Sequence, residues 1–174
     1  PFSQRYTEVK IPSGIKYIGT GCFMNNSIVR ELVFESGSSL TEIPHSSFRR
    51  MGNAPLSDGS TSIDPIDCGV TGDIFVPSGV ETIKSRAFAG VHMKSGAQIH
   101  LPDTVDSIED WVFSQIRTDG AVDLSDTKIK SLELATFYDS SPGSVTLPDS
   151  LEHIKSSCFF TYKPKIDKNF IFGS

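Results

Sequence analysis

Residues 76–88 read Val76-Pro77-Ser78-Gly79-Val80-Glu81-Thr82-Ile83-Lys84-Ser85-Arg86-Ala87-Phe88, and this stretch decides the fold. An alternating apolar stretch ends in a Pro turn, two aliphatic residues follow three positions apart, and Phe comes five residues after the second of them. The same frame recurs along the chain, and its six phenylalanines are Phe23, Phe48, Phe88, Phe113, Phe137 and Phe159. Half of the twelve phenylalanines therefore occupy a single position of a repeat, which we call the Phe column. We expect all six side chains to be buried in the repeat core and to stack on one another.

A short alternating stretch precedes each frame, and it predicts a β-strand because such alternation matches the two-residue period of a strand. These stretches are 9–11, 32–34, 74–76, 99–101, 122–124 and 145–147. Proline follows four of them and predicts a turn, since it fixes φ and cannot donate to a strand ladder. These prolines are Pro12, Pro77, Pro102 and Pro148. The fifth repeat has Ser125-Asp126-Thr127 at this point and gains one residue.

The spacings between successive column phenylalanines are 25, 40, 25, 24 and 22 residues. Units this short cannot enclose a core alone and must stack on their neighbours, which predicts one solenoid domain over residues 1–174. We assign the repeats to residues 9–31, 32–50, 73–97, 98–120, 121–143 and 144–166. The longest gap predicts an insertion loop at 51–72, rich in Gly, Pro and Ser. Residues 170–172 lie where a seventh strand would fall.

The repeat resembles the BspA-like leucine-rich repeats of bacterial surface proteins. The resemblance rests on a strand, then Pro-[Ser/Asp]-x-[Val/Ile/Leu]-x-x-Ile, then a small residue and Phe, and it extends from Val9 to Phe160. The insertion and the missing Pro of repeats two and five depart from the pattern. The resemblance implies a β-dominated right-handed superhelix, with a parallel sheet on the concave face and short turns or helical turns on the other side. It also implies an extracellular or cell-surface setting, adhesion or protein binding, and no catalytic residues.

Composition and charge exclude several classes of protein. The formal net charge is -5, from 16 basic and 21 acidic residues. Nucleic acid is therefore not expected as a partner, because its phosphates require a basic face. No apolar run approaches the ~20 residues that span a bilayer, so we expect no membrane insertion in this segment. No signal peptide is visible, and the targeting segment of an exported parent protein is expected to lie outside this sequence.

The predicted strand face supplies the candidate partner-binding site. Side chains between two buried strand positions point away from the core, and they are Lys10, Val33, Phe75, His100, Asp123 and Thr146. In a curved solenoid this sheet lines the concave face, the usual binding surface. An exposed Phe75 would anchor a protein partner, such as a host or bacterial surface protein. The alternative is that the insertion covers Phe75, since the loop leads directly into its strand.

Other functions are compatible with the same repeat. Glycan binding favours exposed Trp and Tyr, but the single Trp111 falls within the frame from Ile108 to Phe113 and not on the outward column. If the chain is a structural spacer, it needs no ligand-binding site. As a substrate-recruiting appendage of a larger, glycan-degrading extracellular protein, it would leave catalysis to another domain. Uncapped ends of the array would expose apolar edges and strand hydrogen-bonding groups, which favours end-to-end self-association.

Motifs for catalysis or metal binding lack their structural context. Ser13-Gly14-Ile15-Lys16 and Ser125-Asp126-Thr127-Lys128 match S-x-x-K, but both lie at the same turn of the repeat and no companion motif accompanies them. Asp58, Asp64 and Asp67 do not have the spacing of a calcium loop. The four histidines do not have the spacing of zinc ligands. We therefore expect no enzyme activity, no metal and no cofactor.

The three cysteines predict no disulfide framework. Cys22 and Cys158 share the position before the column Phe but belong to the first and the last repeat. At ~4.8 Å per coil their separation is ~24 Å, whereas a disulfide requires Cα atoms within ~7 Å. We expect both to be buried, reduced packing residues, and we expect Cys68 on the insertion to be the accessible cysteine.

Overall fold

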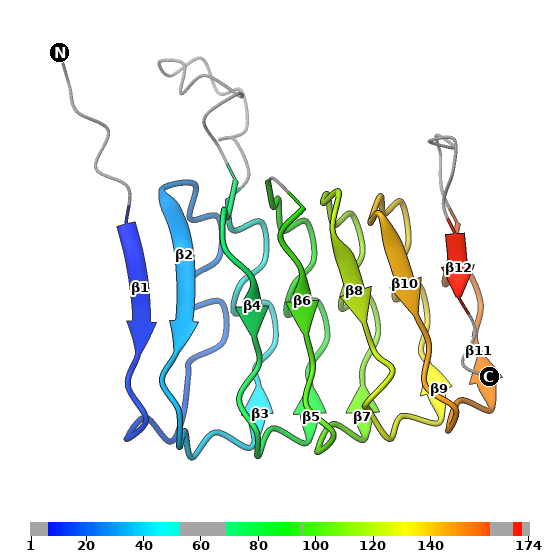
Figure 1. Cartoon of the computed structure of the whole chain (residues 1–174), viewed down its shortest axis with the longest axis horizontal. Coiled ribbons are helices and arrows are strands. Elements are labelled where there is room, and N and C mark those ends of the chain that lie inside the picture. The colour runs from blue at the N-terminus through cyan, green and yellow to red at the C-terminus, as the bar shows by residue number, and fades with distance from the viewer. Residues whose placement is uncertain (1–6, 53–68, 95, 161–168, 172–174) are drawn as a thin grey trace, which may run out of the picture.

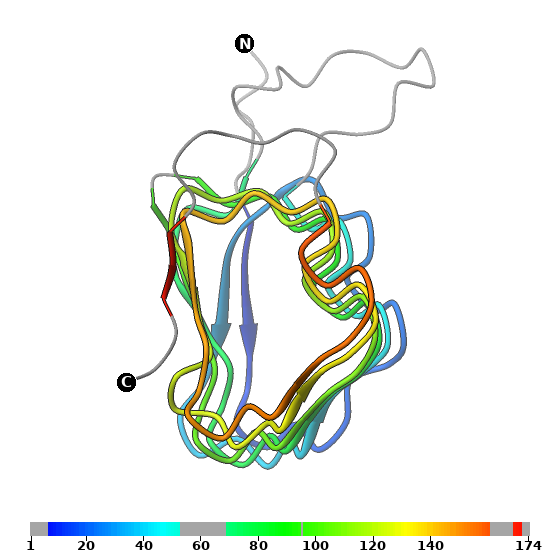
Figure 2. The same cartoon turned by 90° about the vertical axis from the view of Figure 1, so that its right-hand side faces the viewer.

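The computed structural model describes residues 7–52, 69–94, 96–160 and 169–171. These residues form a β-solenoid of about six turns, in which the coils follow one another from the N-terminal to the C-terminal end (Figure 1). Seen along the solenoid axis, the later coils lie on one closed outline, and the two blue strands of the N-terminal end are displaced from it (Figure 2). The outline has a wall of longer strands, a wall of short strands and a wall of turns, and the apolar core lies inside it.

The long-strand wall is made by the alternating stretches of the sequence. Strands β1 (Thr7–Ile11) and β2 (Val29–Phe34) pair in parallel, and a second parallel sheet continues the wall (Figure 1). In chain order its strands are β4 (Ile74–Phe75), β6 (Ile99–His100), β8 (Ala121–Asp123), β10 (Ser144–Thr146) and β12 (Asn169–Ile171). The inward residues Ile74, Ile99 and Val122 are paired in register and fully buried, so β-branched side chains line the core.

A tight turn links each long strand to the short-strand wall. Val80 N donates to Pro77 O at 3.2 Å, and equivalent bonds close the other Pro turns. In coil five the turn closes instead from Thr127 N to Leu124 O, which accommodates the extra residue. The short strands, in parallel sheets β3-β5-β7 and β9-β11, are β3 (Glu42–Ile43), β5 (Thr82–Ile83), β7 (Ser107–Ile108), β9 (Ser131–Leu132) and β11 (His153–Ile154).

The turn wall carries the column phenylalanines, and no helix occurs in the described ranges of the chain. The helical turns allowed by the family resemblance are therefore not found there. Consecutive turns are held by hydrogen bonds between coils: Phe88 N donates to Val112 O at 3.1 Å, and Gly90 N donates to Ser114 O at 2.7 Å. In the first five coils, the residue two before the column Phe donates in the same way. Because each of these coils donates this set to the next one, the turn wall is a backbone ladder without strands.

In the first five coils the ladder requires positive φ at two positions, two residues before and two residues after the column Phe. Gly90 has φ 67°, but Trp111 and Gln115 adopt φ 63° and 56° with side chains present. A positive φ costs ~1–2 kcal/mol for a residue with a Cβ atom. The bonds between coils offset this strain at eight described non-glycine residues: Asn25, Ser46, Arg50, Arg86, Trp111, Gln115, Ala135 and Asp139. Ser157 in the sixth coil also has a positive φ, of 59°.

The column phenylalanines stack as a continuous row through the core. Neighbouring ring centroids lie 5.3–5.9 Å apart with planes within 17° of parallel. The expectation that all six are buried is wrong at the ends. Phe48, Phe88, Phe113 and Phe137 are buried, whereas Phe23 and Phe159 are only partly buried. Phe23 stacks on Phe48 and Phe159 stacks on Phe137, so within the described row each end ring follows a single column neighbour.

Residues at both ends of the expected insertion, 51–72, pack into the core of the solenoid. Met51 and Val70 are fully buried, and Val70 forms a parallel bridge with Met93. Gly52 N donates to Asn26 O at 2.9 Å. The rest of the expected loop, 53–68, lies outside the described residues. At the other end of the solenoid, β12 pairs with β10 where a seventh strand was expected.

Candidate functional site

The outward column lies along the long-strand wall in two runs of paired residues, one in each sheet. Lys10 is the register partner of Val33 on β2, and the pairing continues from Phe75 to His100, Asp123 and Thr146. Lys10, Val33 and Phe75 are exposed, whereas the last three side chains are partly exposed. The structure therefore brings the predicted residues together on one face, and β2 packs beside β4 where the two sheets meet.

Phe75 is the most prominent apolar residue of this face. Its side chain is 61% exposed, and its ring stacks on His100 with centroids 4.4 Å apart and planes 6° from parallel. His100 Nε2 lies 3.2 Å from Asp73 Oδ2, and Asp73 Oδ1 accepts the Gln98 N–H at 2.9 Å. A carboxylate, an imidazole and a phenyl ring are thus held in one ordered cluster on β4 and β6.

Charge is distributed unevenly between the walls. Carboxylates predominate on the outer face of the long-strand wall and in the turn after β2, where they are Glu8, Glu31, Glu35, Asp73 and Asp123. Among the described outward residues of these strands, Lys10 supplies the fixed positive charge, and its Nζ lies 3.2 Å from Glu8 Oε1. Arg49, Arg50 and Arg86 belong to the turn wall. The long-strand face therefore has an acidic character.

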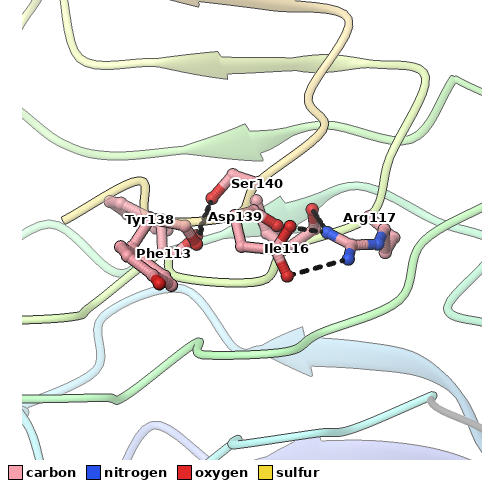
Figure 3. Close-up of polar contacts among 6 residues, drawn as sticks. All are labelled: Phe113, Ile116, Arg117, Tyr138, Asp139 and Ser140. Carbon is pink, nitrogen blue, oxygen red and sulfur yellow. Dashed lines mark hydrogen bonds and ion pairs between the residues drawn. The ribbon is translucent and has the colours of Figure 1, made fainter. Parts of the chain in front are cut away.

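Arg117 of coil four forms hydrogen bonds with Asp139 of coil five (Figure 3). Its guanidinium donates to the backbone oxygen of Asp139, and Nη2 lies 3.4 Å from Asp139 Oδ2. On the neighbouring residue, Ser140 Oγ donates to Phe113 O at 2.7 Å. These contacts tie coil five to coil four at a residue with positive φ, so we assign them a structural role.

A second row of aromatic side chains crosses the turn wall. Trp111 and Tyr138 have ring centroids 5.2 Å apart, and Tyr138 stacks on Phe160 at 5.3 Å. The Arg86 guanidinium carbon lies 5.5 Å from the Trp111 ring centroid. We call Arg86, Trp111, Tyr138 and Phe160 the turn-wall aromatic row. Sequence reasoning missed it because its members are divided between two repeat positions: Arg86 and Trp111 lie two residues before the column Phe, and Tyr138 and Phe160 lie one residue after it. The available signal was the small residues Ser114 and Ala135 at the equivalent positions of neighbouring coils.

The cysteines do not both behave as expected. Cys158 is buried with 2% exposure, and burial raises the pKa of its thiol. The expectation that Cys22 is a buried packing residue is wrong: Cys22 is exposed, because no described coil packs on the outer side of the first one. The two are free thiols in the structure. Cys68 lies outside the described residues.

The remaining candidates give no further site. Within the described ranges, no three His, Cys, Asp or Glu residues are placed so that they could hold a metal ion. Asp58, Asp64 and Asp67 lie outside those ranges. A search of the described residues for a helix long and apolar enough to cross a bilayer found none.

Stacked parallel coils, a phenylalanine row in the core and an outward strand wall define a leucine-rich-repeat solenoid. The family model of the BspA type leucine-rich repeat region matches residues 2–65 and 66–172, with 6 copies. The chain belongs to this family. No curated protein and no solved structure gave a significant match to the chain.

Proposed function

We propose that the chain is a non-catalytic adhesion or binding module of an extracellular or cell-surface protein, and that it binds a protein partner through the outward column. One observation carries the proposal: the paired strands β4, β6, β8 and β10 present an outward row in register that includes a 61% exposed aromatic ring, Phe75. Aromatic side chains are enriched among the residues that dominate binding energy. Membership of the BspA-type family supports an interaction role in general.

The test uses a partner isolated with the intact protein and then measured in purified form. Phe75→Ala and His100→Ala are expected to lose at least ~2 kcal/mol of binding free energy, as anchor residues do. Tyr17→Ala is a matched control, because Tyr17 is 68% exposed but belongs to the segment that leads to the short-strand wall. Equal losses for Phe75→Ala and Tyr17→Ala, or no loss at the column, would favour a spacer or an appendage of a larger extracellular protein.

Glycan binding is a second candidate, and the turn-wall aromatic row favours it. Sugars stack on aromatic rings, and Trp111, Tyr138 and Phe160 are all at least partly exposed. Glycan-array binding that is lost in Trp111→Ala and retained in Phe75→Ala would assign the ligand to this wall. Retention in Trp111→Ala would remove the turn-wall row as the sugar site.

End-to-end self-association is a further proposal, supported by apolar side chains at both ends of the solenoid. Ile15 is 38% exposed in the first coil, and Ile154 and Phe160 are 48% and 49% exposed in the last described coil. Sedimentation at increasing concentration is expected to show assembly that Ile154→Glu weakens. Monomers at all concentrations would exclude it for this chain.

A further inference from the structure

The free face of the Phe75 ring points to the chemistry of the partner. One face of the ring is occupied by His100, which is its register partner on β6. The stack therefore runs along the solenoid axis, and the opposite face is directed toward β2, which packs beside β4. Because Phe75 remains 61% exposed, its second face is accessible to a partner. The face of a phenyl ring carries partial negative charge and attracts cations.

Two carboxylates lie on the same wall as the accessible ring. Asp73 precedes Phe75 by two residues on the same outward side, and Glu31 occupies the outward side of β2. The Asp73 carboxylate is held in place by the Gln98 N–H and by His100, so little side-chain freedom would be lost on binding. The nearby Lys10 is engaged with Glu8 at 3.2 Å. An acidic surface of this kind attracts basic side chains of a partner and disfavours acidic ones.

We propose that the outward column takes a basic segment of its protein partner, in which a Lys or Arg side chain packs on the free face of Phe75 between Asp73 and Glu31. The inference rests on the proposed function, because it names the chemistry of the partner at the same site. The aliphatic stem of the basic side chain would cover the ring while its charge remains near the carboxylates. The exposed part of Val33 lies on the same strand as Glu31 and extends the apolar surface.

The first experiment needs no identified partner. A short Gly/Ser peptide with arginine at alternate positions is titrated into the isotopically labelled protein, and amide chemical shifts are followed. Matched peptides carry citrulline, which is isosteric but uncharged, or glutamate. We expect shifts confined to β2, β4 and β6 with the arginine peptide and at least about tenfold weaker binding of the citrulline peptide, since exposed charge pairs and cation–π contacts each contribute modestly.

Variants then separate the ring from the charges. Asp73→Asn retains the acceptor for the Gln98 N–H, and Glu31→Gln alters an exposed side chain. Each variant is expected to weaken binding of the arginine peptide about three- to fivefold. Phe75→Leu keeps an apolar side chain without the ring, and it is expected to weaken binding of the arginine peptide by a similar factor. Asp106→Asn and Tyr17→Leu are matched controls on exposed residues away from this wall, and both should bind like the parent protein.

The outcomes distinguish the two proposals. Equal binding of the arginine and citrulline peptides, or equal losses in Asp73→Asn and Asp106→Asn, would overturn the basic-partner inference. If a purified partner nevertheless depends on Phe75 and not on Asp73 or Glu31, the protein-binding proposal stands and only the basic chemistry is wrong. If the shifts map to the turn wall, both proposals fail for this face.

Discussion

The rings of Phe88 and Phe113 stack with their centroids 5.9 Å apart and their planes 9° from parallel, although they belong to different coils. Both side chains are fully buried, and the row continues to Phe48 on one side and Phe137 on the other. Stacked aromatic pairs contribute ~0.5–1.5 kcal/mol beyond the burial of their area. The row therefore couples each coil to two neighbours, so a defect in one coil is expected to weaken the whole array.

Phe88→Ala is expected to lower the free energy of unfolding by ~3–5 kcal/mol, as large-to-small core substitutions do. Phe75→Ala removes the same side chain from an exposed position and should cost less than ~1 kcal/mol. Denaturant unfolding of both variants and the parent protein measures the difference. Similar losses for the two phenylalanines would contradict the assignment of Phe88 to the core.

The positive φ angles predict an unusual effect of glycine. Gln115 is exposed with φ 56°, so Gln115→Gly should relieve backbone strain and raise the free energy of unfolding by up to ~1 kcal/mol. Lys128 is also exposed but has no positive φ, and Lys128→Gly should lower it by ~0.5–1 kcal/mol. Thermal unfolding in which both glycines destabilise equally would refute the strain argument.

Close approach between coils makes Gly143 sensitive. A Cβ atom at this position would lie 2.1 Å from Asp119 O, whereas a Cβ at Gly72 would have no atom within 4 Å. Gly143→Ala must displace backbone and is expected to cost ~1–3 kcal/mol, the range of overpacking. Gly72→Ala should be close to neutral. Comparable stabilities of the two alanine variants would show that the coils can separate at Gly143 without loss.

The cysteines are expected to differ in reactivity. Cys22 is exposed and should react rapidly with a thiol reagent in the folded protein, while the buried Cys158 should react only on unfolding. A count in denaturant after air oxidation should return three thiols, Cys68 included. A count of one would mean that two cysteines pair and that the coil positions of Cys22 and Cys158 are wrong.

The raised pKa of the Cys158 thiol also has a pH consequence. The unfolded chain loses this proton at a lower pH than the folded protein, so the contribution to stability is complete below an unfolded pKa of about 8.5 and declines as the pH rises above it. Cys158→Ala should reduce this alkaline decline when unfolding is measured from neutral to alkaline pH. An unchanged decline would assign it to other groups.

His92 produces the opposite pH dependence. Burial lowers the pKa of His92, and the positive charges of Lys94, Arg117 and Arg30 lower it further. The negative charge of Asp119 acts in the opposite direction. As the pH falls below about 6.5, the unfolded chain binds the proton before the folded protein, and stability decreases until folded His92 is also protonated. His92→Gln should flatten the stability curve on the acid side of that value. A curve parallel to that of the parent protein would exclude His92 as the source.

Much of the fold could be predicted from the sequence alone. The repeat can be identified because a Phe follows Ile83 and each of its equivalents at a fixed distance. In a solenoid, residues at the same repeat position occupy equivalent places in the core of successive coils. Alternation along 74–76 and 99–101 likewise determines which side chains point outward, since successive side chains of a strand lie on opposite faces. This information is local and repeats in every unit.

The tertiary structure alone decided what depends on neighbouring coils. Cys22 is exposed and Cys158 is buried although they share one repeat position. The Cys158 thiol packs on the preceding coil, where its Sγ lies 3.5 Å from Leu132 O, whereas no described coil precedes the coil of Cys22. Trp111 meets Tyr138 from a different repeat position, and this contact exists only once the coils are stacked. The periodicity of the sequence assigns a side chain to a wall, but exposure and contacts across coils arise from packing between units that are distant along the chain.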